Sequence, residues 1–195
     1  MTDTTPTGTE PTRNPTAPLG EQDRREALLA ALVELEHHVA DGGWDAPARL
    51  FALVETDALA AAEPDLARAL NLRTSADGAA PGALTAIEQD TFAPTDDLLG
   101  DLGGIEWPGE VFGAAVATTR TFLPSTVEVE LPDDAGEAAA FVAAHPSAQE
   151  IRVVVAVDRS GTQHGVARLR SQPEELLAGT DLVPGLATAL AHTLG

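Results

Sequence analysis

The sequence contains no cysteine, no tyrosine and no lysine, and the missing cysteine excludes several classes of site. A disulfide scaffold, a thiolate zinc site, an iron–sulfur cluster and a cysteine nucleophile all need that residue. Positive charge is scarce as well, because 11 arginines stand against 31 Asp and Glu and the net charge is −20. A chain of this charge is repelled by nucleic-acid backbones and anionic membranes, so we expect neither as a partner.

Long apolar runs are also missing. No stretch reaches the 18 apolar residues that a membrane-spanning helix needs. The first residues lack the basic start and the apolar run of a secretory signal. These features favour a cytoplasmic protein.

What is present is enough apolar sequence for one core, since 44% of the 195 residues are hydrophobic. Residues 1–20 are mostly Thr, Pro, Gly and small polar residues, which cannot offset the entropy of ordering. We therefore predict a disordered tail over 1–20 and a single α+β domain over 21–195.

Leucine spacing predicts a first helix over 21–40. Leu28, Leu32, Leu35 and Val39 recur at steps of three and four residues, the period of one helical face. The pair of glycines that follows this stretch is typical of a helix end.

Apolar residues in later segments follow the patterns of strands rather than that of a helix. The run 49–56 is apolar at both odd and even positions, which suits a strand buried on both faces. Segment 126–131 alternates Val or Leu with Glu, as an exposed edge strand or an extended arm does. We also predict strands over 84–90 and 110–122, a helix over 133–144, a hairpin over 150–170 and a last helix over 182–194.

The resulting element order is α-β-β-β-α-β-β-α, without βαβ periodicity. Such an order favours a mainly antiparallel sheet of about five strands with helices packed mainly on one face.

The hairpin over 150–170 has a register that can be worked out. A three-residue loop at 159–161 pairs Asp158 with Thr162 and keeps the apolar residues on one side. That loop needs a left-handed residue at its third position, where Gly161 stands.

This register gathers charge on the other side of the hairpin. Arg152 lies opposite Arg168, and like charges directly across a sheet are destabilising unless something neutralises them. One interpretation is a site for an anion or an acidic ligand, bound by guanidinium groups. The alternative is neutralisation by the chain's own carboxylates, with Glu128 and Glu130 as candidates. The possible anion or partner site comprises Arg152, His164, Arg168 and Arg170.

Motifs for catalysis, cofactors or metals are absent. Nucleophile elbows, phosphate-binding loops, dinucleotide fingerprints and HExxH are missing. Glu34, His37 and His38 resemble half of a metal site, but a second Glu-x-x-His is missing, and histidines near a helix end are more often dipole complements. We predict no cofactor, no metal and no catalytic residue, and an enzyme is the less favoured class.

The two tryptophans, Trp44 and Trp107, each lie close to a proline. Tryptophan is enriched at binding hot spots, so either residue could anchor a partner. The alternative is that both fill the core of a chain with few aromatic residues.

Four phrases of the sequence resemble a family of uncharacterised actinobacterial proteins. They are WDAPARLFALV at 44–54, IEWPGEVFG at 105–113, EIRVVVAVDRSG at 150–161 and DLVPGL at 181–186. The element order resembles the fold of type III secretion chaperones, which is a likeness of fold alone.

Together these features favour a non-enzymatic, cytoplasmic protein-binding module of adaptor or chaperone-like character. Its partner is another protein or a second copy of the chain. The alternative is a sensor or enzyme that binds a small anionic ligand at the arginine cluster, and a weaker one is a structural subunit of an assembly.

Overall fold

A computed structural model describes residues 20–180, 182–183 and 185–195 of the chain. Nearly all of the predicted tail, residues 1–19, lies outside the described residues. The helices are α1 (Glu21–Ala40), α2 (Thr56–Ala62), α3 (Pro64–Ala69), α4 (Leu98–Leu102), α5 (Ala135–Ala144) and α6 (Leu186–Thr193), with a 3₁₀ turn at Ser75–Asp77. The strands are β1 (Arg49–Glu55), β2 (Leu84–Glu88), β3 (Gly113–Phe122), β4 (Gln149–Asp158), β5 (Gln163–Leu169) and β6 (Gln172–Gly179).

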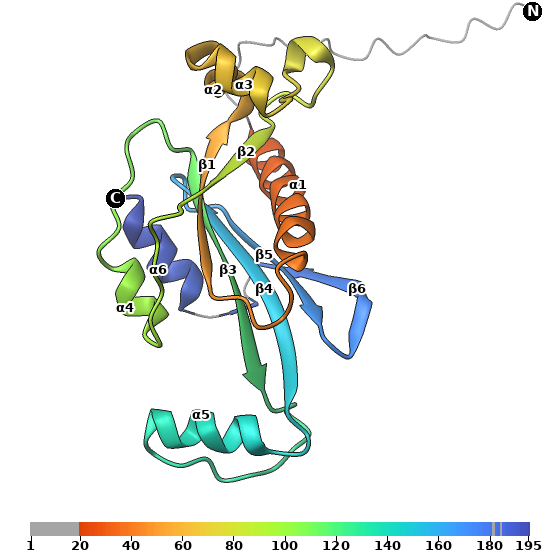
Figure 1. The fold of residues 1–195 in the computed structure, drawn as a ribbon, viewed down its shortest axis with the longest axis vertical. Coiled ribbons are helices and arrows are strands. Elements are labelled where there is room, and N and C mark those ends of the chain that lie inside the picture. The colour runs from red at the N-terminus through yellow and green to blue at the C-terminus, as the bar shows by residue number, and fades with distance from the viewer. Residues whose placement is uncertain (1–19, 181, 184) are drawn as a thin grey trace, which may run out of the picture.

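The described strands form one antiparallel sheet in the order β2-β1-β3-β4-β5-β6 (Figure 1). The predicted α+β class and the antiparallel sheet are confirmed. The sheet has six strands rather than about five, because β6 escapes the sequence pattern. Its residues, QPEELLAG, include a proline and two adjacent glutamates and do not alternate.

Helices cover both faces of the sheet, which differs from the expectation that they pack mainly on one. The α1 face carries Phe51, Leu53, Ala115 and Val154, packed against the leucine stripe of α1. The α6 face carries the alternate residues, packed against α4 and α6. Successive side chains of a strand point to opposite faces, so strands that are apolar at both parities need a cover on each side.

Small residues let β3 pack closely against its neighbouring strands in the middle of the sheet. At Gly113, a Cβ atom would stand 2.5 Å from the carbonyl oxygen of Val157 on the neighbouring strand. Ala114 and Ala115 are fully buried on opposite faces. The close approach of backbone to backbone therefore depends on the absence of larger side chains.

The hairpin of β4 and β5 has the predicted register. Arg152 is paired with Arg168, and the backbone N–H of Asp158 donates to the carbonyl of Thr162. Gly161 adopts a φ of +83°, the left-handed conformation that the three-residue loop requires. The Asp158 carboxylate accepts hydrogen bonds from the backbone N–H groups of Ser160 and Thr162, which hold the loop closed.

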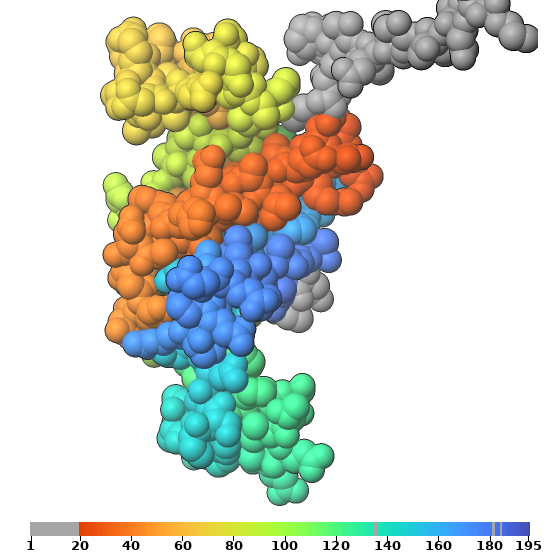
Figure 2. Space-filling model, turned by 90° about the vertical axis from the view of Figure 1, so that its right-hand side faces the viewer, coloured from red at the N-terminus to blue at the C-terminus, as the bar shows by residue number. Residues whose placement is uncertain are grey.

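The segment between β3 and β4 projects away from the sheet (Figure 1). Residues 126–131 form no strand, so they match the extended arm rather than the edge strand. Helix α5 follows, and Figure 2 shows this part of the chain as a separate projection below the body of the molecule. Within the described residues, no helix has the length and apolar character to cross a bilayer.

Candidate functional site

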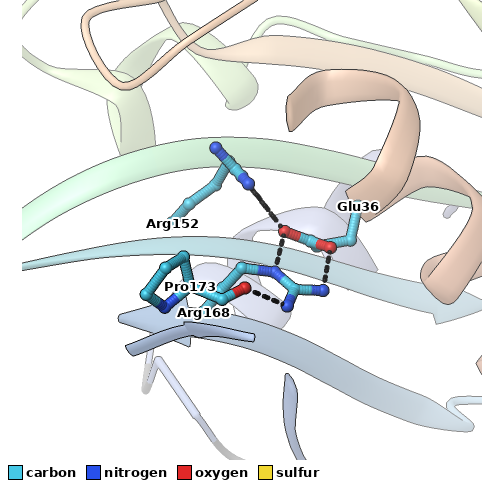
Figure 3. A network of polar contacts seen from close by, with 4 residues as sticks. All are labelled: Glu36, Arg152, Arg168 and Pro173. Carbon is cyan, nitrogen blue, oxygen red and sulfur yellow. Dashed lines mark hydrogen bonds and ion pairs between the residues drawn. The ribbon is translucent and has the colours of Figure 1, made fainter. Parts of the chain in front are cut away.

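Two arginines of the hairpin, Arg152 and Arg168, converge on one carboxylate from α1 (Figure 3). Glu36 Oε1 accepts hydrogen bonds from Arg152 Nη2 at 2.8 Å and from Arg168 Nε at 2.9 Å. Glu36 Oε2 accepts one from Arg168 Nη2 at 2.7 Å. Arg168 and Glu36 thus form a bidentate guanidinium–carboxylate pair, and Arg152 binds the same carboxylate as a second guanidinium. The three side chains connect α1 to β4 and β5.

Glu36 is fully buried, and its charge persists because of these partners. Burial alone raises the pKa of Glu36, but the hydrogen bonds and charges of Arg168 and Arg152 outweigh it and hold the pKa below its ordinary value. In return, the hydrogen bond that Arg168 donates to Glu36 raises the pKa of Arg168. Glu36 and Arg168 thus each favour the charged form of the other.

Trp44 covers the outer side of the same network. Its ring lies 4.7 Å from the guanidinium carbon of Arg152 and 5.9 Å from that of Arg170. Such cation–π stacking partly replaces the water that Arg152 loses on burial. Arg170 also pairs with the carboxylate of Glu150 at 2.5 Å.

The structure therefore brings together Arg152, Arg168, Arg170 and Trp44, and the chain supplies its own anions. This is the arrangement that the sequence left open as the alternative to a bound anion. The carboxylates come from Glu36 and Glu150, whereas Glu128 lies in the projecting segment, as Glu130 does.

A signal for Glu36 was present in the sequence. The residue lies four positions after Leu32 and three before Val39, on the apolar stripe of α1. A carboxylate on such a stripe is buried with the stripe and needs a cation opposite it.

His164 lies apart from the network. It pairs with Ala156, four residues further along β4 than Arg152. Burial lowers the pKa of His164, and the charge of Arg25 lowers it further. Its Nδ1 is buried without a hydrogen-bond partner among the described residues. His164 thus lies near the first turns of α1, in surroundings that favour its neutral form.

Trp107 closes the opposite face of the sheet. Its indole Nε1–H donates to Thr193 Oγ1 at 2.9 Å, and its ring packs against the α6-face core. Arg159 reinforces this join, because its guanidinium donates to the carbonyls of Trp107, Pro108, Val111 and Leu194. Both tryptophans are half-buried and engaged within the chain.

The residues considered for a metal do not assemble. His38 Nε2 lies 2.9 Å from Arg49 Nη2, a cation that itself pairs with Glu88. Glu34 and His37 are exposed. In the described part of the chain, no three His, Cys, Asp or Glu side chains come together as metal ligands.

An apolar groove opens on the α6 face of the sheet. Helix α6 packs on β3 and β4, so the same face of β1 and β2 is only partly covered by residues 91–111. The space left has a volume of about 610 Å³. We call it the open-face groove, and it is lined by Leu50, Val54, Ile87, Phe92, Ile105 and Trp107, with polar residues such as Asp101 and Glu106 at its margin.

A second hollow, of about 280 Å³, lies on the other face of β2. We call it the helix-side hollow, because α1 forms one wall and β2 the other. Its apolar lining comprises Ala31, Leu35, Phe51, Leu72, Leu84 and Ala86. Glu34, His38 and Glu88 contribute polar groups to it.

The surroundings of these two hollows are acidic. The segment 84–110 contains seven carboxylates and neither arginine nor lysine. Asp90 and Glu106 are exposed there, whereas Asp101 binds the backbone and hydroxyl of Thr95. A partner that enters the hollows therefore meets negative charge at their margins.

These features define the chain as an α+β protein with one antiparallel sheet, helices on both faces and apolar hollows beside the β2 edge. It belongs to the PPA1309-like protein family, whose model matches residues 28–195. The resemblance to an uncharacterised family is thereby confirmed at the level of the family. No curated protein and no solved structure matches the chain.

Proposed function

We propose that the protein is a non-enzymatic binding module that takes up a cationic, apolar segment of another protein in the open-face groove. The observation that carries this proposal is the groove itself. It is lined by Val54, Ile87, Phe92 and Trp107, side chains that the chain's own helices leave half-exposed. The same proposal includes three expectations from the sequence: an actinobacterial source, a cytoplasmic location and a chaperone-like character.

Burial of apolar surface supplies the driving force. Covering one large apolar side chain of a partner contributes about 1.5–3 kcal/mol. The groove has room for more than one such side chain at about 610 Å³. Micromolar affinity corresponds to about −8 kcal/mol, so a segment needs several anchored side chains together with polar contacts to offset the cost of association.

Charge selects the kind of partner. The acidic margin of the groove attracts Arg and Lys side chains that flank the apolar anchors. A second copy of the chain brings a net charge of −20 to the same margin, which disfavours self-association there. The preferred occupant is therefore a heterologous basic segment.

The arginine network has a structural role in this proposal. Its guanidinium groups are occupied by Glu36 and Glu150, and it fastens α1 to the hairpin that supports the sheet. The alternative function, binding of a small anion at Arg152, Arg168 and Arg170, lacks a comparable supporting observation.

A peptide-display selection on the purified full chain tests the proposal. We expect a library of random dodecapeptides to converge on aliphatic or aromatic residues flanked by Arg or Lys. A synthetic consensus peptide should bind with micromolar affinity, and raising NaCl from 50 to 300 mM should weaken it several-fold.

Two substitutions locate the binding surface. Ile87→Lys places a cation in the groove and should weaken the consensus peptide at least tenfold. Leu177→Lys, on the exposed strand β6, is the matched control and should leave the affinity unchanged. A selection without a consensus, or equal affinity for both variants, would overturn the proposal.

A further inference from the structure

The outer edge of β2 presents unpaired backbone groups. The N–H of Gln89 donates to Leu50 O, and the N–H of Thr56 donates to Ala83 O, both at 2.9 Å. In an antiparallel pair the bonded residues alternate, so the odd-numbered residues of β2 bond to β1. The backbone N–H and C=O groups of the even-numbered residues, Leu84, Ala86 and Glu88, consequently point away from the sheet. Of the strands that the structure describes, none pairs with β2 on that side.

Two hollows flank this edge, one on each face. Leu84, Ala86 and Glu88 line the helix-side hollow, and Ile87 lines the open-face groove. Successive side chains of a strand point to opposite faces at a spacing of about 3.3 Å per residue. A strand added beside β2 would direct alternate side chains towards the helix-side hollow and towards the groove.

We propose that the partner segment binds in an extended conformation, as a seventh strand on the outer edge of β2. Its backbone exchanges hydrogen bonds with Leu84, Ala86 and Glu88. Its side chains alternate between the helix-side hollow and the open-face groove, which is the β-strand addition mode of peptide recognition. This inference rests on the proposed function and adds the binding mode and the sequence class of the partner.

The dimensions of the two hollows specify the side chains. The helix-side hollow, at about 280 Å³, fits aliphatic residues, and the groove of about 610 Å³ accepts larger or aromatic ones beside Phe92 and Trp107. Glu34 borders the first hollow and Asp90 follows the end of β2, both exposed. The segment therefore alternates small and large apolar residues over about five positions and has Arg or Lys at its ends.

The other edge of the sheet, β6, lacks these features. Pro173 provides no N–H, and Glu174 and Glu175 place two exposed charges on the strand. The carbonyl of Pro173 is already used by Arg168. Strand addition is thus favoured at β2 and disfavoured at β6.

Hydrogen exchange in the unmodified chain tests the binding mode. With the consensus peptide bound, the amide protons of Ala86 and Glu88 should exchange at least tenfold more slowly. Those of Thr85 and Ile87, which already bond to β1, should change little. An alternating pattern of this kind arises only if the peptide pairs with the edge of the strand.

Matched variants supply a second readout. Ala86→Pro removes the outward N–H and should weaken the peptide at least tenfold, whereas Leu177→Lys on β6, at the other edge of the sheet, should bind within twofold of the unmodified chain. On the peptide side, N-methylation of the residues whose backbone N–H points towards β2 should abolish binding. N-methylation of the alternate residues, whose N–H points away from β2, should not. The peptide variants keep the test valid even if Ala86→Pro fails to fold.

The outcomes separate this inference from the proposed function. If Ile87→Lys weakens the peptide but amide protection does not alternate and N-methylation has no positional effect, the groove binds a partner in another conformation and strand addition is overturned. If Ile87→Lys has no effect either, the proposed function fails as well.

Discussion

Arg152 and Arg168 face each other directly across β4 and β5, yet their guanidinium groups donate to one carboxylate. Like charges in this position destabilise a sheet. Glu36 converts the repulsion into a bridge between α1 and the β4–β5 hairpin.

Removing the bridging charge should be strongly destabilising. Glu36→Gln leaves two buried guanidinium groups short of one negative charge, and we expect a loss of about 3–5 kcal/mol in the free energy of unfolding. Urea denaturation followed by circular dichroism measures it. Glu34→Gln, at an exposed position of the same helix, is the control and should change the stability by less than about 0.5 kcal/mol. A loss below about 1 kcal/mol for Glu36→Gln would contradict the network.

Replacing all three members of the network should cost far less. In the triple variant Glu36→Leu, Arg152→Met, Arg168→Met, no buried charge remains and apolar side chains fill the space. Buried ion-pair triads replaced in this way are often neutral or stabilising. We expect the triple variant to be at least about 2 kcal/mol more stable than Glu36→Gln alone. The same urea titration checks it, and a triple variant as unstable as the single one would refute the prediction.

Acid should weaken the network with a definite sign. Because Arg168 and Arg152 lower the pKa of Glu36 in the folded chain, the unfolded chain binds the proton first as the pH falls. The stabilisation is complete above the ordinary pKa of 4.5 and is lost as the pH falls through the folded-state value. The difference in stability between the unmodified chain and Glu36→Gln should be constant from pH 5.5 to 7 and shrink below pH 4.5. A difference independent of pH down to pH 3 would disprove it.

His164 should contribute a separate pH dependence. Burial lowers its folded-state pKa, so the folded chain resists protonation that the unfolded chain accepts near pH 6.5. Stability is therefore fully present above pH 6.5 and declines as the pH falls towards the folded-state value. His164→Gln should remove this part of the slope between pH 6.5 and 5. Denaturant titrations of both proteins across that range measure it, and identical slopes would contradict the prediction.

A methyl group at Gly113 should disturb the middle of the sheet. In Gly113→Ala the new Cβ stands 2.5 Å from Val157 O, so β3 and β4 must separate. We expect a loss of about 1–3 kcal/mol. Gly109→Ala, where no atom lies within 4 Å of the new Cβ, is the control. Equal stability of the two variants would show that the strands are less closely apposed.

Local patterns predict α1 and the β4–β5 hairpin well. The leucine stripe defines the helix over Glu21–Ala40, and the position of Gly161 together with the alternation of apolar residues fixes the hairpin register. Both elements follow from short-range patterns, because the residues that determine each element lie within it or directly beside it. The last helix begins later than its leucine spacing suggests, at Leu186 rather than 182, after Gly185 with a φ of +85°.

Features that depend on distant segments escape the sequence. Strand β6 forms because β5 offers an edge, although its own glutamates and proline disfavour a strand. The position of β2 at the end of the sheet follows from strand order, which no local pattern encodes. Glu36 was visible on the apolar stripe of α1, but its partners lie 116 and 132 residues away.

That separation has a consequence for synthesis of the chain. Glu36 is synthesised 132 residues before Arg168, and at about 5–20 residues per second this interval lasts about 7–26 s. During this interval Glu36 lacks both of its guanidinium partners. The leucine stripe can pack on β1, β2 and β3, but Val154, Ala156 and Val166 of the hairpin are still missing from its core cluster. Completion of the fold is thus deferred until the hairpin emerges, and until then part of the apolar face of α1 stays exposed to solvent.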